Sequence, residues 1–587
     1  MATQQTAVSR RQTAARREAR NESRRDRASS DTAVAPISPS PWILDRWRDL
    51  LLFVGTPLVL IPLFAAAQRR WSAQDIFLFV GAFGAMGHHL PGMIRAYGDR
   101  ALFERFKTRF VVAPLGILAV CIWSAVYNIQ AIQLVALAWG IWHGMMQTYG
   151  FCRIYDAKAG AKAAARARAD FNLCFVWFVG AVLLSPLRFR SCLELYYESG
   201  GPVIPPALLS FLRNGMVLAL ALVTIFFLWR HFRDSVTGQG RSPVKMALLA
   251  TSIAFWWYCN NGVQNILVGI ALFEVFHDVQ YLSIVWIYNR TRVERDQTIS
   301  GFMRFVFRRS GALLGVYVGL VVAYGSIALI TSGVSAEGIR YFLVGVVTAS
   351  ALLHFYYDGF IWKVRETQTR SMLGIAEQAQ PVVARARATP GWFGHSLRWA
   401  AFVIPFAIFC AAQLLGRVVP PIERFAKVAE VLPKDAQAQL NYGKALHEAG
   451  RAAEANEYYK AAIGLQPSLQ PAEMFLGLAW SDLGDMGQAI EHYERAVALD
   501  PKDAKTECNL GCIFVSLRRY DEARHRLEHS LSLQPDLFLA HKELGDVLIA
   551  TGEIDAAISH YSEAIRLKPG FTEAEDGLKF ARSLAAR

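Results

Sequence analysis

Acidic residues are scarce in the first 422 positions, and cysteines are scarce throughout. Residues 1–422 hold 22 Asp and Glu against 43 Lys and Arg, whereas residues 423–587 hold 26 acidic and 19 basic residues. The eight cysteines have no spacing typical of a zinc site or a disulfide framework. This excludes a cysteine-ligated metal module and a disulfide scaffold. The reversal of charge near residue 423 predicts two parts of different character.

The length and the apolar composition exclude a single soluble domain. The chain has 587 residues, 53% of them hydrophobic, and a mean hydropathy of +0.24. Several long apolar runs predict an all-α fold, in which a polytopic transmembrane bundle precedes an acidic soluble domain. Lys and Arg gather on the cytoplasmic loops of membrane proteins. We therefore attribute the net charge of +14 to basic cytoplasmic loops of a protein that lies in the bilayer, and no nucleic-acid partner is expected.

Large apolar side chains are almost missing from residues 1–41, which are rich in Arg, Ala and Ser. Such a composition cannot form a packed core, so we expect a disordered basic tail on the cytoplasmic side. No secretory signal peptide is expected, because the first apolar run begins near Trp42 and continues as a full span.

The transmembrane domain is expected at residues 42–416 and contains about eleven apolar segments. They lie at about 50–67, 73–95, 109–127, 130–150, 170–187, 207–230, 244–258, 262–288, 311–332, 340–362 and 397–416. Basic loops alternate with nearly uncharged turns, as a cytoplasmic N-terminus requires, although Arg69 and Arg70 depart from this pattern. An odd number of spans places the C-terminal domain outside the cytoplasm, which is the periplasm in a Gram-negative cell.

The C-terminal region repeats every 34 residues. The recurring residues are Pro433, Pro467, Pro501, Pro535 and Pro569, with Gly443, Gly477, Gly511 and Gly545 between them. This pattern resembles the tetratricopeptide repeat, a helix–turn–helix unit of that length that stacks into an α-solenoid. The resemblance implies a linker and half repeat at 417–435, four repeats at 436–571 and a capping helix at 572–587. It also implies a protein or peptide partner on the concave face.

Histidines are few in the apolar segments, and they occur at similar depth. Four different segments carry them: His88 and His89 share one segment, and His143, His277 and His354 lie in one each. In each segment the histidine precedes the basic residue that closes the segment; these residues are Arg95, Arg153, Arg290 and Lys363. In the predicted topology all four segments run toward the cytoplasm, so imidazoles from four helices share the cytoplasmic half of the membrane. His88 and His89 are about 100° apart on a helix, so one of the two is expected to ligate.

Acidic residues accompany these histidines at helical spacing. Glu274, His277, Asp278 and Tyr281 share one helix face, and Asp358 follows His354 by four residues. A carboxylate inside a bilayer is costly and usually faces a partner, a metal ion or water. Imidazole and carboxylate together suit iron, zinc, copper or manganese, and iron is the metal we expect. The predicted metal site therefore contains His88, His89, His143, His277, His354, Glu274, Asp278 and Asp358.

The number and depth of these histidines are similar to those of integral-membrane iron oxygenases of the Brp/Blh type, which oxidise isoprenoid lipids. That similarity implies an oxidoreductase with a non-haem iron and a lipid-soluble substrate that enters from the bilayer. Tyr281, Tyr356 and Tyr357 would then line the substrate pocket; otherwise they are packing aromatics.

Other interpretations of the same residues stay open. The histidines can be interhelical hydrogen-bonding groups, ligands of b-type haem, or parts of a proton-coupled transporter with carboxylates as carriers. The whole chain can be a non-enzymatic scaffold or assembly factor that recruits partners through its repeats. Eleven spans before an external repeat domain are also similar to GT-C glycosyltransferases, but the first external loop offers only Asp75 as an acid.

Overall fold

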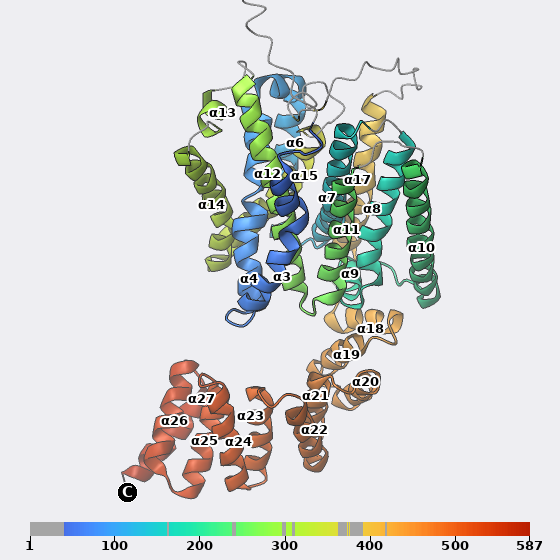
Figure 1. Cartoon of the computed structure of the whole chain (residues 1–587). Helices are drawn as coiled ribbons and strands as arrows, with labels where there is room; N and C mark the ends of the chain where they lie inside the picture. Colours follow the sequence, from blue (N-terminus) through green and yellow to red (C-terminus); the bar gives the residue numbers. More distant parts are fainter. Residues whose placement is uncertain are drawn as a thin grey trace, which may run out of the picture.

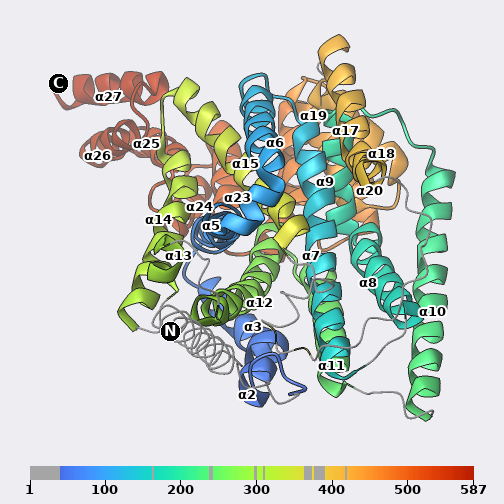
Figure 2. The same cartoon turned by 90° about the horizontal axis from the view of Figure 1, so that it is seen from above.

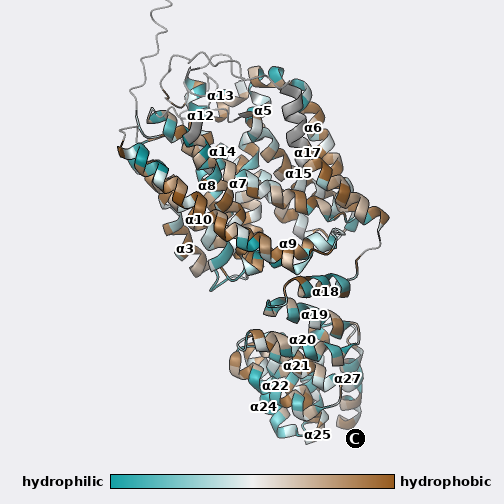
Figure 3. Ribbon diagram, turned by 90° about the vertical axis from the view of Figure 1, so that its right-hand side faces the viewer, coloured by the Kyte–Doolittle hydropathy of each residue, from teal (hydrophilic) through white to brown (hydrophobic). Residues whose placement is uncertain are grey.

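The computed structural model describes residues 40–160, 164–236, 242–295, 301–307, 311–361, 373, 375, 391–416 and 419–586. These residues form helices and connecting turns, without strands. Figure 1 shows a bundle of long helices above a row of shorter ones. Brown apolar residues gather in the bundle, and teal polar residues are frequent in the lower row (Figure 3). Residues 1–39 of the predicted tail and parts of the segments between predicted spans, Lys363 included, lie outside the described residues.

The bundle consists of residues that the sequence predicts as apolar segments, with short helices between them. Its elements are α2 (Arg46–Asp49), η1 (Leu50–Gly55), α3 (Thr56–Ala67), α4 (Ala73–Val80), η2 (Gly81–Met86), α5 (His89–Gly98), α6 (Arg100–Val126), α7 (Ala131–Lys158), α8 (Ala164–Leu184), α9 (Pro186–Glu198), α10 (Pro206–Val236), α11 (Pro243–Trp257), η3 (Tyr258–Gly262), α12 (Ile266–Arg295), α13 (Gly301–Val306), α14 (Gly311–Gly333), α15 (Glu337–Ile361) and α17 (Gly391–Leu415). The three η elements are π-helical turns within or at the end of longer helices.

Within the described residues, seven helical stretches are long and apolar enough to cross a membrane. They are Arg46–Ala67, Ala73–Gly98, Arg100–Val126, Arg166–Leu184, Pro206–Val236, Ile266–Glu294 and Glu337–Phe360. Two shorter apolar helices, Gly315–Thr331 and Phe402–Leu415, coincide with predicted segments. The predicted segments at 130–150 and 244–258 are also helical, as α7 and α11. Seven spans are therefore supported by length and composition, and the total of eleven stays a prediction.

Helix α12 is the centre of the bundle, and α10 lies at its edge. Two-thirds of the apolar stretch of α12 is buried (67%), against 11% in α10. Figure 2, seen along the bundle, shows α10 at the outer side of α8. A buried helix can carry polar groups without exposing them to lipid, and α12 is the helix that carries Glu274, His277 and Asp278.

Helix α9 is an element that the sequence analysis did not anticipate. Ser185 caps it by accepting a hydrogen bond from the backbone N–H of Arg188, and Pro186 occupies its first position. The prediction for 170–187 joined the start of α9 to the preceding span. The structure instead ends α8 at Leu184, because the cap and the proline begin a new helix.

The row of shorter helices consists of four helical hairpins and one terminal helix. Their bounds are α19 (Ala436–Glu448), α20 (Ala452–Leu465), α21 (Gln470–Asp482), α22 (Met486–Leu499), α23 (Ala504–Ser516), α24 (Tyr520–Leu533), α25 (Phe538–Thr551), α26 (Ile554–Leu567) and α27 (Thr572–Ala585). The small residues Ala455, Ala489, Ala523 and Ala557 are fully buried where the two helices of each hairpin meet. Each recurring glycine faces a side chain of the partner helix in its hairpin, as close packing requires. The pairs are Gly443 with Tyr459, Gly477 with Tyr493, Gly511 with Leu527 and Gly545 with Tyr561.

Helix α18 (Pro421–Val431) joins the two parts of the molecule. It packs on α9, with Val428 and Val431 against Leu193 and Tyr197 of that helix. Arg190 of α9 donates two hydrogen bonds, of 2.8 and 3.0 Å, to the carboxylate of Asp435 at the start of α19. The first hairpin is therefore fixed to the end of the bundle by both apolar and ionic contacts.

Candidate metal centre

Four helices bring one histidine each to the middle of the bundle. His88 precedes α5, His143 lies on α7, His277 on α12 and His354 on α15. All four side chains are buried, with exposed fractions of 2%, 9%, 5% and 0% in that order. The π-helical η2 directly before His88 is a local widening of the helix, a feature that is frequent at functional sites.

The four imidazoles meet through their Nε2 atoms. Nε2 of His354 lies 3.2 Å from Nε2 of His88 and 3.1 Å from Nε2 of His143. Nε2 of His143 lies 3.2 Å from Nε2 of His277. The rings are steeply inclined to one another, at 87° for His88 and His354 and 67° for His143 and His277, so the contact is between nitrogen atoms and not between stacked faces.

Hydrogen bonds alone satisfy this arrangement poorly. Nε2 of a neutral imidazole has either one hydrogen or one lone pair. His354 and His143 each have two other Nε2 atoms as neighbours. One hydrogen or lone pair would then have to serve two partners. A cation at the centre would instead accept a lone pair from each ring.

The separations fit nitrogen ligands of one metal ion. Metal–nitrogen bonds of about 2.0–2.1 Å in tetrahedral or octahedral geometry place neighbouring ligand atoms roughly 3 Å apart. In the part of the chain that the structure describes, two sets of potential ligands have their donor atoms within 4.8 Å of one another: His88 with His277 and His354, and His143 with His354 and Asp358. Because His354 belongs to both sets, they form one cluster.

Two carboxylates lie at the edge of this cluster. Oδ1 of Asp278 is 2.6 Å from Nδ1 of His88, the ring nitrogen that points away from the other histidines. Oδ2 of Asp358 is 3.8 Å from Nε2 of His354 and 3.9 Å from Nε2 of His143. The hydroxyl of Tyr281 donates a hydrogen bond of 2.9 Å to Oδ1 of Asp358. Asp278 can thus orient a ligand, and Asp358 is near enough to become one.

Two members of the predicted set are placed differently. His89 directs Nδ1 to the hydroxyl of Ser350 at 2.8 Å, and its ring stacks on His354 at a centroid distance of 4.8 Å. Glu274 is partly exposed and belongs to neither set of potential ligands. The structure therefore puts His88 rather than His89 at the centre. The orientation of the pair could not be read from the sequence, because η2 changes the helical register just before it.

The three tyrosines predicted to line a substrate pocket lie in two different places. Tyr281 is part of the site through Asp358. Tyr357 instead contacts the hydroxyl of Tyr97 at 2.6 Å, and Tyr356 donates to the backbone carbonyl of Arg109. Both lie in an aromatic cluster against α6. Tyr356 and Tyr357 are therefore packing aromatics and do not line a pocket beside the histidines.

Other residues near the histidines support the site. The side chain of Gln147 donates to the backbone carbonyl of His277 at 3.1 Å, and Tyr324 contacts the same Ser350 hydroxyl as His89 at 3.0 Å. Gly84 and Gly92 leave room for Asp278 and Tyr281. Gly84 could have been found from sequence, because it stands one helical turn before His88. Asp75 caps α4 with Ser72 and lies outside the site.

Comparisons with known proteins concern the C-terminal part of the chain. Family models of the tetratricopeptide repeat match residues 422–469, 474–503 and 508–570. No curated protein matches the chain. The resemblance of residues 42–416 to the Brp/Blh oxygenases finds no support in these comparisons.

Solved structures that resemble the chain are repeat proteins. One is the MamA protein, with 25% identity, 25% of this chain and 80% of that chain covered, and a TM-score of 0.23. Another is YrrB, described as a tetratricopeptide-repeat protein with an unusual peptide-binding site, with 21% identity, coverage of 28% and 85%, and a TM-score of 0.25. A third is a thermophilic repeat protein of Thermus thermophilus, with 20% identity, coverage of 32% and 97%, and a TM-score of 0.25. The family-model matches show that the segment from α18 to α26 is a tetratricopeptide-repeat domain, as its 34-residue period predicts.

Proposed function

We propose that the bundle holds a metal ion at His88, His143, His277 and His354, with Asp358 as a further ligand. The observation that carries this proposal is the meeting of four Nε2 atoms, from four helices, at separations of 3.1–3.2 Å along the chain of contacts. If the rings are neutral and form one N–H···N bond in each outer pair, the contact between His354 and His143 is left without a hydrogen, whereas a cation would accept a lone pair from each ring.

The chemistry of the donor set suits iron. Imidazole and carboxylate without thiolate suit iron, and also zinc or copper, whereas a set of oxygen ligands would suit magnesium or calcium. Asp278 keeps the hydrogen of His88 on Nδ1, which leaves the Nε2 lone pair directed to the centre. The Tyr281 hydroxyl holds Oδ1 of Asp358, and Oδ2 of the same carboxylate lies 3.8 Å from Nε2 of His354, on the side of the centre.

The enzymatic part of the proposal is the oxidation of a lipid-soluble substrate. Iron bound there would supply redox chemistry with dioxygen. The chain's own contribution is a buried position within an apolar bundle, which an apolar substrate reaches from the bilayer and from which bulk water is excluded. The repeat domain serves protein–protein interaction, and on the predicted topology it binds a protein or peptide partner outside the cytoplasm, in the periplasm of a Gram-negative cell.

The test is the metal content of the purified full-length chain, measured by elemental analysis together with its absorption spectrum. We expect about one iron per chain, without the Soret band of a haem. His354→Ala should lose most of the metal, because His354 belongs to both sets of potential ligands. His89→Gln is the matched control and should keep it, because His89 directs Nδ1 to Ser350. A wild-type chain without bound metal, or a His354→Ala variant that binds it fully, would overturn the proposal.

A further inference from the structure

Two positions of the repeat unit form a pair of polar side chains between the helices of a hairpin. In the second hairpin, Glu473 of α21 accepts a hydrogen bond of 2.7 Å from Nδ1 of His492 in α22. The third hairpin again has a carboxylate at the first of these positions, Glu507, which pairs with basic side chains of α24. In the fourth hairpin the same two positions are His541 of α25 and His560 of α26. A histidine therefore stands where the two preceding hairpins have an acid.

The two imidazoles of the fourth hairpin contact each other directly. Nδ1 of His541 lies 2.9 Å from Nδ1 of His560. On the other side of its ring, Nε2 of His541 lies 3.0 Å from the backbone carbonyl oxygen of Pro535. A carbonyl oxygen can only accept, so this contact keeps the hydrogen of the neutral ring on Nε2 and leaves the lone pair on Nδ1. Backbone carbonyls orient metal-binding histidines in the same way.

The second ring can also present a lone pair. Burial and the neighbouring His541 lower the pKa of His560 below its ordinary value, so this ring is neutral at pH 7. With its hydrogen on Nδ1, His560 donates to His541. With its hydrogen on Nε2, which water can accept because His560 is only partly buried, both Nδ1 atoms carry lone pairs that face each other. A cation stabilises this second arrangement, and no proton has to leave the ring.

The separation of the two nitrogen atoms fits adjacent ligands of one metal ion. For metal–nitrogen bonds of about 2.0–2.1 Å, a distance of 2.9 Å between the nitrogens corresponds to an angle of about 90° at the metal. Right angles are typical of the tetragonal and square-planar sites of Cu²⁺ and Ni²⁺. A tetrahedral zinc ion would instead place the two nitrogens roughly 3.3 Å apart.

We infer that His541 and His560 bind a divalent late transition-metal ion, such as Cu²⁺ or Ni²⁺, through their Nδ1 atoms. The acidic side chains near the pair, Glu528 and Glu563, are held by arginines, so water fills the remaining coordination positions. The ion ties α25 to α26 and stabilises the last hairpin. This site lies in the repeat domain and is independent of the metal centre proposed in the bundle.

Hydrogen exchange of residues 538–567 in the full-length chain, with and without Ni²⁺, tests this inference. An ion that binds only the folded hairpin slows exchange in proportion to its free concentration, about 100-fold at 100 times the dissociation constant. His541→Gln should abolish the slowing. Glutamine occupies this repeat position in the first hairpin, as Gln439, so the fold accepts it. His560→Tyr, which copies Tyr458 of the first hairpin, should abolish the slowing as well.

Two further variants serve as matched controls. His525→Gln removes an exposed histidine of the neighbouring α24, and His354→Ala removes a histidine of the bundle; both should keep the slowing. The inference is overturned if excess Ni²⁺ leaves exchange of the hairpin unchanged, if both His541→Gln and His560→Tyr are slowed as the wild type is, or if His354→Ala is not slowed. Exchange without Ni²⁺ identifies a variant whose hairpin is unfolded, and the other variant then decides.

Discussion

At the scale of single residues, the site depends on a missing side chain. Gly84 lies on η2 opposite Asp278, and a Cβ atom at position 84 would stand 2.5 Å from Oδ2 of Asp278. The same carboxylate has its Oδ1 atom 2.6 Å from Nδ1 of His88. The absence of a side chain therefore allows the carboxylate of α12 to reach the histidine of the neighbouring helix.

We predict that Gly84→Ala lowers metal affinity without unfolding the bundle. The flexible Asp278 side chain must move away, and Nδ1 of His88 then keeps only the weaker backbone carbonyl of Gly84, at 3.2 Å, as an acceptor. Loss of such a partner typically costs 10- to 100-fold in metal affinity. The measurement is iron retained during competition with a chelator. Gly116→Ala is the control, because a Cβ atom there meets nothing within 4 Å. Equal retention in the two variants would show that Asp278 does not hold His88.

At the scale of helices, the repeats are held together by one recurring contact. In the last hairpin, Gly545 of α25 faces the ring of Tyr561 of α26, and a Cβ atom at position 545 would lie 2.8 Å from that ring. The ring is further fixed by its hydroxyl, which donates a 2.6 Å hydrogen bond to Asp546. The separation of the two helices is therefore set by the absence of a side chain at position 545.

We predict that Gly545→Ala destabilises the last hairpin although alanine is the better helix former. Overpacking against a fixed ring costs about 1–3 kcal/mol, and the gain in helix propensity returns at most about 1 kcal/mol. Gly464→Ala in α20 meets nothing within 4 Å and should be neutral or stabilising. Hydrogen exchange of residues 538–567 and 452–465 in the full-length protein gives both free energies of local opening. Slower exchange in the Gly545→Ala variant would refute the packing argument.

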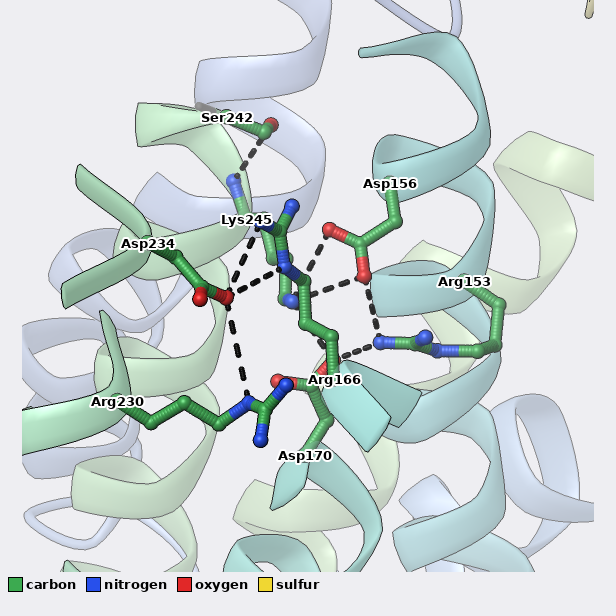
Figure 4. A network of polar contacts seen from close by, with 8 residues as sticks. All are labelled: Arg153, Asp156, Arg166, Asp170, Arg230, Asp234, Ser242 and Lys245. Carbon is green, nitrogen blue, oxygen red and sulfur yellow. Dashed lines mark hydrogen bonds and ion pairs between the residues drawn. The ribbon is translucent and has the colours of Figure 1, made fainter. Parts of the chain in front are cut away.

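At the scale of the molecule, the ion pairs of Lys245 with Asp156 and Asp170 (Figure 4) lie at the end of the bundle opposite the repeats. Helices α8 and α10 run between these ends, from the Arg166–Asp234 ion pair to Leu184 and Pro206 beside α9. Both have stretches long and apolar enough to cross a membrane. Consequently, the two ends should face different compartments.

We predict that a membrane-impermeant maleimide added to intact cells labels Glu457→Cys in α20 but not Arg233→Cys at the end of α10. Both side chains are exposed, by 75% and 52%, so accessibility itself does not distinguish them. Permeabilised cells provide the control, because both cysteines should then react. Labelling of Arg233→Cys alone in intact cells would reverse the predicted orientation, and equal labelling of both would contradict the separation of the two ends.

The sequence by itself determined the features that depend on spacing along one helix. Small residues and prolines recurring every 34 positions are enough to define helical hairpins, because each hairpin packs mainly on its neighbours in the chain. Histidines at similar distance from the basic end of each span predicted a common depth. The shared face of His277, Asp278 and Tyr281 followed from the helical period alone.

Only the tertiary structure decided how the helices are rotated and which of them are neighbours. The π-helical turn η2 directs His88 and not His89 to the centre, and the partly exposed Glu274 stays outside the ligand sets. Helix α9 packs on α18 and so fixes the repeats to the bundle, although the two helices are far apart in sequence. The ion pairs of Lys245 with Asp156 and Asp170 also join residues that are distant in sequence. A periodic pattern gives the depth and the face of a residue, but the partner on that face depends on packing between helices, which no local spacing encodes.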